Sequence, residues 1–133
     1  MNKRIIPKIA GYTKIEVLSF VKLKLHTDSV WAMRGCLAIF NQQTQEEQKK
    51  HLSTGGHNGC GFSRNHAPKL SSIACRIKQG RHMKQDIDTL FVFMPYYAAQ
   101  LICISATVKK NLDGLIHHLD NYYNKPKQYK LPF

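Results

Sequence analysis

The segment DSVWAMRGCLAIFN, residues 28–41, decides the fold class of this chain, because its apolar residues recur at helical spacing. Four of them follow one another at intervals of three or four residues: Val30, Met33, Leu37 and Phe40. Three more widen the apolar face: Trp31, Ala38 and Ile39. Asp28 or Thr27 can cap the helix, since a short side-chain oxygen accepts a hydrogen bond from a free N–H in the first turn. The segment therefore predicts a helix that buries this face in the core.

Outward from this helix, apolar spacing predicts four more helical segments, at about residues 13–25, 67–79, 84–105 and 113–123. The predicted buried stripe of the first is Ile15, Leu18, Val21 and Leu25. Pro68 suits the first turn of its helix, and Gly80 suits the left-handed residue just past the end. Pro95 kinks or ends the fourth segment. Residues 20–25 alternate like a strand and residues 101–108 are rich in β-branched side chains, so a strand is the alternative at both places.

These elements predict one compact, mainly α domain of about five helices, which suits a length of 133 residues. Glycines between the second and third helices, with the turn-forming pair Asn58-Gly59, predict a loop over residues 53–62. We expect a basic N-terminal arm at residues 1–12, the helical domain at 13–123 and an extended basic tail at 124–133. No apolar run approaches the roughly 20 residues of a membrane span. The N-terminus lacks the pattern of a signal peptide, so we expect a cytoplasmic protein without membrane contact.

The distribution of charge points to an acidic partner. The chain has 20 Lys and Arg against 8 Asp and Glu, a net charge of +12. Between Glu47 and Asp86 there are eight positive residues and no carboxylate. A surface with this bias attracts polyanions. We therefore expect the cations of this segment to share one exposed side of the folded protein.

Nucleic acid is the polyanion that these residues favour. Cations contact phosphates, and free N–H groups at a helix N-terminus add to such a site, which the loop over residues 55–61 would approach. Tyr122, Tyr123 and Tyr129 in the basic C-terminal region suit stacking on unpaired bases. No helix-turn-helix or RNA-recognition signature is present, so base-specific reading is not indicated. The predicted nucleic-acid-binding residues are His57, Asn58, Arg64, Lys69, Arg76, Lys78, Arg81, Lys84, Lys125, Lys127 and Lys130.

Metal-binding and catalytic chemistry are less favoured. Four potential zinc ligands lie within sixteen residues: His51, His57, Cys60 and His66. Only His57 and Cys60 have the short pairing of a zinc site, so we expect no metal or other cofactor. The four cysteines are far apart and are expected to be reduced, and no spacing singles out a Cys–His nucleophile. Asp86 and Asp88 are interpreted as solvated helix-surface acids, which leaves no carboxylate cluster for a nuclease.

Three blocks of sequence resemble a poorly characterised family of small proteins from phages, plasmids and other mobile elements. They are WAMRG at residues 31–35, HNGCGF at residues 57–62 followed by LSS at 70–72, and MPYYA at residues 94–98 followed by Gln100-Leu101. The resemblance implies a mobile-element origin and a loose association with DNA metabolism or conflict with a host, but no catalytic residue.

The sequence as a whole therefore predicts a non-catalytic nucleic-acid-binding protein of a phage or plasmid that contacts mainly the phosphate backbone. The alternative hypothesis is an inhibitor of a host defence system, of the anti-CRISPR or anti-restriction kind, that binds a nuclease complex. The excess of positive charge fits this alternative less well, because a protein that imitates DNA is expected to be acidic.

Overall fold

A computed structural model describes residues 6–42 and 61–128, with side chains up to residue 123. The described part is mainly helical, as predicted. Its elements are α1 (Lys14–Thr27), α2 (Ser29–Gln42), α4 (Ala67–Lys78), α5 (Lys84–Phe93), the 3-10 turn η1 (Met94–Tyr97), α6 (Ala98–Ala106) and α7 (Lys109–Gln128). Each of the five predicted helical segments is helical, and the fourth is divided into α5, η1 and α6. The predicted loop at residues 53–62 lies outside the described residues except for its last two.

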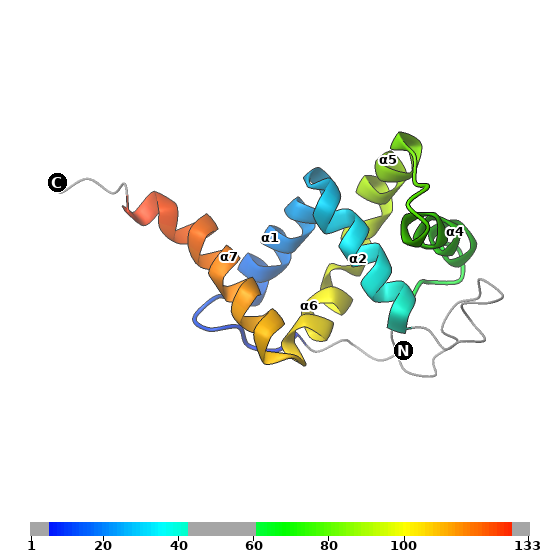
Figure 1. The fold of residues 1–133 in the computed structure, drawn as a ribbon. Coiled ribbons are helices and arrows are strands. Elements are labelled where there is room, and N and C mark those ends of the chain that lie inside the picture. Colours follow the sequence, from blue (N-terminus) through cyan, green and yellow to red (C-terminus); the bar gives the residue numbers. More distant parts are fainter. Residues whose placement is uncertain (1–5, 43–60, 129–133) are drawn as a thin grey trace.

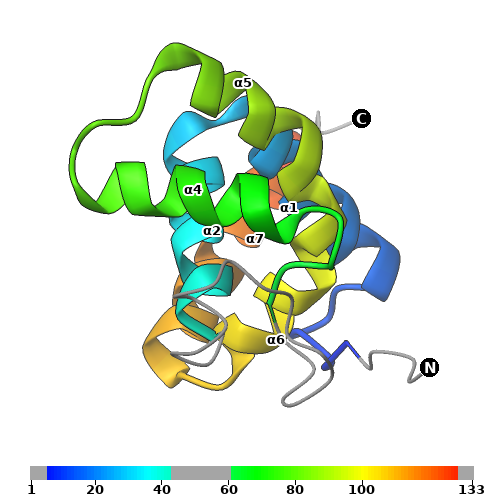
Figure 2. The same ribbon diagram turned by 90° about the vertical axis from the view of Figure 1, so that its right-hand side faces the viewer.

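The helices pack in an elongated arrangement with α4 at one end and α7 at the other (Figure 1). The central helix α2 contacts α1, α4, α5, η1 and α6. Figure 2 shows α4 crossing in front of α2, with α5 above it, so that α4 covers one side of this centre. α7 packs on α1 and α6 at the other end.

The helix α1 begins at a reciprocal N-terminal cap. Thr13 Oγ1 accepts a hydrogen bond from Glu16 N–H at 3.1 Å, and the Glu16 carboxylate accepts one from Thr13 N–H at 2.8 Å. The buried side chains are Val17, Phe20, Val21 and Leu25. The predicted stripe is therefore wrong at its start, where Ile15 is 74% exposed and Val17 is buried instead.

The buried face of α2 is rotated from the one that the sequence predicted. The fully covered residues are Ala32, Gly35, Cys36, Ile39 and Phe40, whereas Val30 is 47% exposed. Met33 and Leu37 are only partly buried. Ile39 and Phe40 are buried as predicted, and the small residues Ala32, Gly35 and Cys36 complete the buried face, because small residues let neighbouring helices approach closely.

Pro95 explains the division of the fourth segment, because proline has no N–H to continue the helical ladder. The chain tightens into η1 at Met94–Tyr97 and resumes as α6. Leu90, Met94 and Ile102 are buried along this run. The strand alternatives for residues 20–25 and 101–108 are wrong, since both stretches are helical up to Ala106.

The N-terminal segment and α7 are joined to α1 by specific contacts. Ile9 is buried in the core, although it belongs to the predicted N-terminal arm. The Tyr12 hydroxyl donates a hydrogen bond to Asp120, and burial together with this carboxylate raises the pKa of Tyr12 to about 12. The Tyr123 hydroxyl donates to the carbonyl of Glu16 at 2.7 Å. α7 extends to Gln128, so the first five residues of the predicted extended tail are helical instead.

One stretch among the described residues, Lys84–Ala106, is long and apolar enough to cross a membrane by length and composition alone. Core helices of soluble proteins meet the same criterion, so one such stretch is weak evidence for a membrane span. The stretch contains the buried residues Leu90, Met94 and Ile102, which pack with α1 and α2.

Candidate nucleic-acid interface

The helix α4 and its flanks carry the densest set of predicted phosphate-binding residues that the structure describes. His66 is the N-cap residue and Pro68 lies in the first turn, so the helix begins where the sequence predicted. Gly80 adopts φ +68° just past the end, which is the left-handed conformation that glycine tolerates. Five cations are exposed along this segment: Arg64, Lys69, Lys78, Arg81 and Lys84.

Arg76, the sixth predicted cation, is engaged in an ion pair. Its Nε and Nη2 donate hydrogen bonds to the two carboxylate oxygens of Asp86 at 2.9 and 2.8 Å. Asp86 is only 7% exposed and also accepts a hydrogen bond from Met83 N–H at 3.0 Å. The hydrogen bonds from Arg76 hold the pKa of Asp86 below its usual range, and the same pairing raises the pKa of Arg76.

Two sequence interpretations change as a result. Asp86 is not a solvated surface acid, because it is a buried carboxylate that joins the start of α5 to α4. Arg76 is predicted from sequence to bind phosphate, but the Nε–Nη2 edge of its guanidinium is occupied by Asp86 and its charge is neutralised there. Arg76 is therefore better described as a structural residue of the interface.

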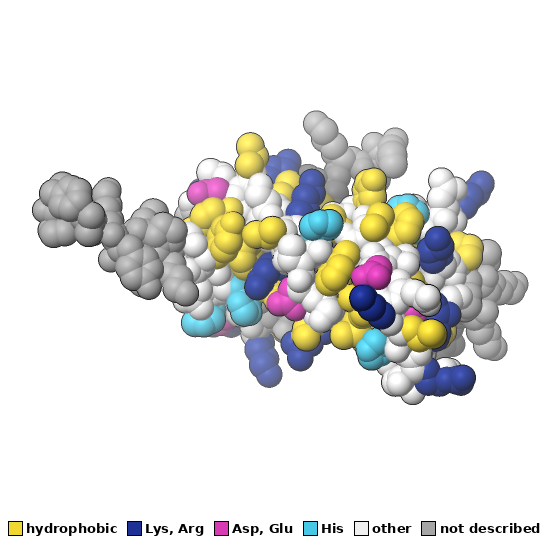
Figure 3. Space-filling view, turned by 90° about the horizontal axis from the view of Figure 1, so that it is seen from above, with side chains coloured by type: hydrophobic (Ala, Val, Ile, Leu, Met, Phe, Trp, Pro, Cys, Tyr) yellow, Lys and Arg dark blue, Asp and Glu magenta, His cyan; other side chains and the backbone are white. Residues whose placement is uncertain are grey.

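The remaining cations of the segment have no Asp or Glu within ion-pair distance among residues 6–42 and 61–123. Lys69 lies over the ring of Phe93 on α5, with 5.5 Å from Nζ to the ring centroid. Lys78 lies over Phe40 on α2 at 5.0 Å. The two lysines thus point to different neighbours of α4. Figure 3 shows Lys and Arg side chains along the whole of one face, with apolar side chains between them, so the charge is not confined to α4.

An aromatic cluster adjoins these cations. The His66 ring lies 4.7 Å from Phe93 and 5.8 Å from both Tyr96 and Tyr97, measured between ring centroids. His66 Nδ1 is 2.7 Å from the Tyr97 hydroxyl, which accepts a hydrogen bond from Ser63 N–H. Tyr97 is buried, which raises its pKa, whereas Tyr96 is 75% exposed. The cluster therefore consists of an inner part, in which His66 and Tyr97 are held by hydrogen bonds, and one exposed ring, that of Tyr96.

The sequence analysis did not predict this cluster, although it named His66 as a potential zinc ligand. The signal was the spacing of Phe93 and Tyr96, three residues apart on either side of a proline that tightens the turn. What the spacing does not show is that the start of α4 lies against this turn. That proximity depends on the packing of both segments around α2.

Gln100 fixes the chain where it enters the cluster. Its side-chain amide donates to the carbonyl of Gly61 at 3.0 Å and accepts from Gly61 N–H at 2.8 Å. Gly61 has φ +129°, a conformation that favours glycine. The predicted residues His57 and Asn58 lie outside the described residues, so their relation to this site stays a prediction.

In the described part of the C-terminal region, the tyrosines predicted to stack on unpaired bases pack against the protein instead. Tyr123 is partly buried between α7 and α1, and Tyr122 packs against Phe20 with 5.0 Å between ring centroids. The predicted cations Lys125, Lys127 and Lys130 belong to the part of the chain whose side chains are not described.

Metal and nucleophile hypotheses gain no support from the described side chains. His51, His57 and Cys60 lie outside the described residues, and His66 is engaged with Tyr97. Within residues 6–42 and 61–123, no three His, Cys, Asp or Glu side chains converge as metal ligands would. Burial raises the pKa of Cys36 to about 12, and its thiol donates to the carbonyl of Leu70. A thiol in this state is a poor nucleophile.

Cys36 is accordingly expected to resist alkylation in the folded protein. Iodoacetamide at pH 8 should modify Cys75 and Cys103, which are partly exposed, before Cys36, which is fully buried. Peptide mass mapping after a timed reaction gives the order of modification. Cys36 should react at the rate of an ordinary thiol only after denaturation, and equal rates in the native protein would contradict its placement.

Comparison of the chain with models of known protein families, with curated proteins and with solved structures finds no match. The resemblance to small mobile-element proteins therefore stays a prediction.

Proposed function

We propose that this protein is a non-catalytic nucleic-acid-binding protein and that α4 with its flanks forms the contact surface. The observation that carries the proposal is the set of five exposed cations on this segment with no acidic partner among residues 6–42 and 61–123. Lys and Arg release counterions when they neutralise phosphates, which gives affinity without sequence specificity. Origin in a phage or plasmid belongs to the same proposal.

The local balance of charge supports this surface. Asp86 is neutralised by Arg76, so it does not repel a phosphate as a free carboxylate would. Asp88 is the other acid on α5 and is exposed. Between Gly61 and Phe93 there are six Lys and Arg against these two acids, which leaves an attractive field for a polyanion.

The aromatic cluster favours unpaired bases over a duplex. Tyr96 presents an open ring that contacts His66, and His66 in turn contacts Phe93, the ring beneath Lys69. Stacking on such a ring contributes about 1–3 kcal/mol per base and tolerates any base. We therefore propose single-stranded nucleic acid as the preferred form.

Fluorescence anisotropy with a labelled single strand and its duplex, at several salt concentrations, tests the proposal. The variant Arg64→Gln/Lys69→Gln/Arg81→Gln should lose affinity by about tenfold or more, and its salt slope should fall by about 2, at roughly 0.7 per phosphate contact. The control Lys8→Gln/Lys14→Gln/Lys22→Gln removes the same charge from exposed positions outside α4. Equal losses in both variants would show attraction by net charge alone and would overturn this surface.

A second comparison tests stacking. Tyr96→Ala should weaken binding of the single strand by about fivefold or more and leave the duplex nearly unchanged. Tyr122→Ala, which removes a 45% exposed tyrosine from α7, is the matched control. No binding of either polymer at low salt would refute the function. The alternative of a nuclease inhibitor has no separate observation in its favour and stays a hypothesis.

A further inference from the structure

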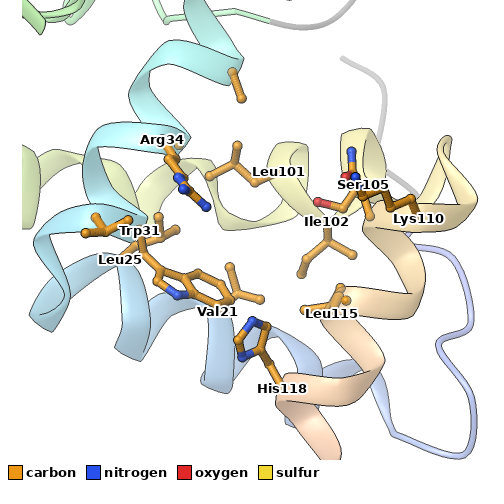
Figure 4. Close-up of a pocket in the computed structure, with 15 residues that line it drawn as sticks. Val21, Leu25, Trp31, Arg34, Leu101, Ile102, Ser105, Lys110, Leu115 and His118 are labelled. Carbon is orange, nitrogen blue, oxygen red and sulfur yellow. The ribbon is translucent and has the colours of Figure 1, made fainter.

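A groove of about 470 Å³ lies between α2 and α7, away from the proposed nucleic-acid surface (Figure 4). α1 and α6 form its floor. The floor residues are apolar and buried: Val21, Leu25 and Ile102, with the buried Leu115 of α7 beside them. Pockets of roughly 300–1,000 Å³ with apolar walls and a few polar groups are the usual sites for small organic molecules.

Small residues and one ring contact give the groove its shape. Two of its lining residues, Ala38 on α2 and Gly114 on α7, are small. A Cβ added at Gly114 would meet no atom within 4 Å, which shows that this wall faces open space. At one end Trp31 and His118 join the two walls, with their ring centroids 5.4 Å apart.

The charged groups of the groove are all positive or potentially positive. Arg34 from α2 and Lys110 from α7 lie on opposite sides of the opening, and His118 closes one end (Figure 4). No Asp or Glu lines the groove. Neither Arg34 nor Lys110 has an ion-pair partner among residues 6–42 and 61–123. The site therefore combines an apolar floor with two cations free to bind an anion.

We propose that this groove binds a small amphipathic organic acid, with its carboxylate between Arg34 and Lys110 and its apolar body on the floor beside Trp31. A guanidinium binds a carboxylate through two parallel hydrogen bonds, and an ammonium adds a third donor. The body of the acid removes apolar floor from water, which favours binding. The shared chemistry is one anionic head on an apolar body, whether aliphatic or aromatic.

The fluorescence of Trp31, the only tryptophan of the chain, reports occupancy directly. The full-length protein is titrated with decanoate and, separately, with naphthoate, below the concentrations at which either self-associates. Saturable binding at one site by either acid supports the proposal and tells whether the body is aliphatic or aromatic. Decanol, which lacks the charge, should bind at least about tenfold more weakly than decanoate.

Matched variants test the geometry. Arg34→Gln/Lys110→Gln should weaken binding of the acid by about tenfold or more. Lys109→Gln removes the neighbouring charge, which is paired with Asp113 at 3.4 Å, and should leave affinity within about twofold. Gly114→Leu should fill the groove and abolish binding of both acids, with circular dichroism and thermal unfolding to show that the fold is kept. Absence of saturable binding by either acid, or unchanged binding in folded Gly114→Leu, would overturn the proposal.

Discussion

Replacing Asp86 with alanine is expected to lower the free energy of unfolding by about 2–4 kcal/mol. The substitution removes two hydrogen bonds to Arg76 and one from Met83 N–H. It also leaves the Arg76 guanidinium without its counter-charge. Loss of one partner of a fully buried pair costs about 3–5 kcal/mol, and the value here is lower because the Arg76 side chain is 40% exposed. Urea unfolding at pH 7, followed by circular dichroism, measures the change.

The same ion pair predicts how stability depends on pH. Because the pKa of Asp86 is lower in the folded protein than in the unfolded chain, its contribution is fully present above the ordinary carboxyl pKa. This contribution is lost as the pH falls through the pKa that Asp86 has in the folded protein. The difference between the wild type and Asp86→Ala should therefore be constant from pH 5 to 7 and shrink below about pH 4.

Asp88→Ala is the matched control, because Asp88 lies on the same helix but is exposed. It should change stability by no more than about 0.5 kcal/mol. If Asp86→Ala were equally neutral at pH 7, the pairing with Arg76 would not be a structural contact, and Arg76 would return to the set of candidate phosphate ligands.

The positions of the helices could be predicted from the sequence, but not the side that each one buries. Helical spacing, the first-turn proline Pro68 and the left-handed Gly80 are local properties of the chain. The buried face of α2 depends on its neighbours, because five other elements pack around it. Apolar spacing correctly chose Ile39 and Phe40, but it also chose the half-exposed Val30 and missed Ala32, Gly35 and Cys36.

The candidate sites likewise combine features that could be predicted from the sequence with features that could not. Exposed cations on α4 could be predicted, since a lysine on a polar helix face is seldom buried. The pairing of Arg76 with Asp86 could not, because the sequence gives no measure of how the link after Gly80 brings α5 back to α4. The groove between α2 and α7 is formed by residues from four helices. Its small residues have no recognisable pattern in any one of them.

Gly35 is the position at which the close packing around α2 is most demanding. A Cβ built there would lie 3.0 Å from Leu101 Cδ1, 3.1 Å from Leu25 Cδ2 and 3.2 Å from Met94 Cε. These three side chains come from α6, α1 and η1, so one added methyl group would press on three elements at once. Close-packed interiors yield little to such pressure.

Gly35→Val is therefore expected to lower the free energy of unfolding by about 2–3 kcal/mol, since overpacking outweighs the gain of a few tenths in helix propensity. Gly35→Ala should cost about 1 kcal/mol or less, because alanine gains up to about 1 kcal/mol in propensity and the facing atoms are ends of flexible side chains. Gly114→Ala, the same change in open space on α7, should instead stabilise the protein by about 0.5–1 kcal/mol. Chemical unfolding of the three variants measures the order of their stabilities and the opposite signs of the changes at Gly35 and Gly114. A Gly35→Val variant as stable as Gly114→Ala would mean that α2 does not approach α1, η1 and α6 as closely as the contacts at Gly35 require.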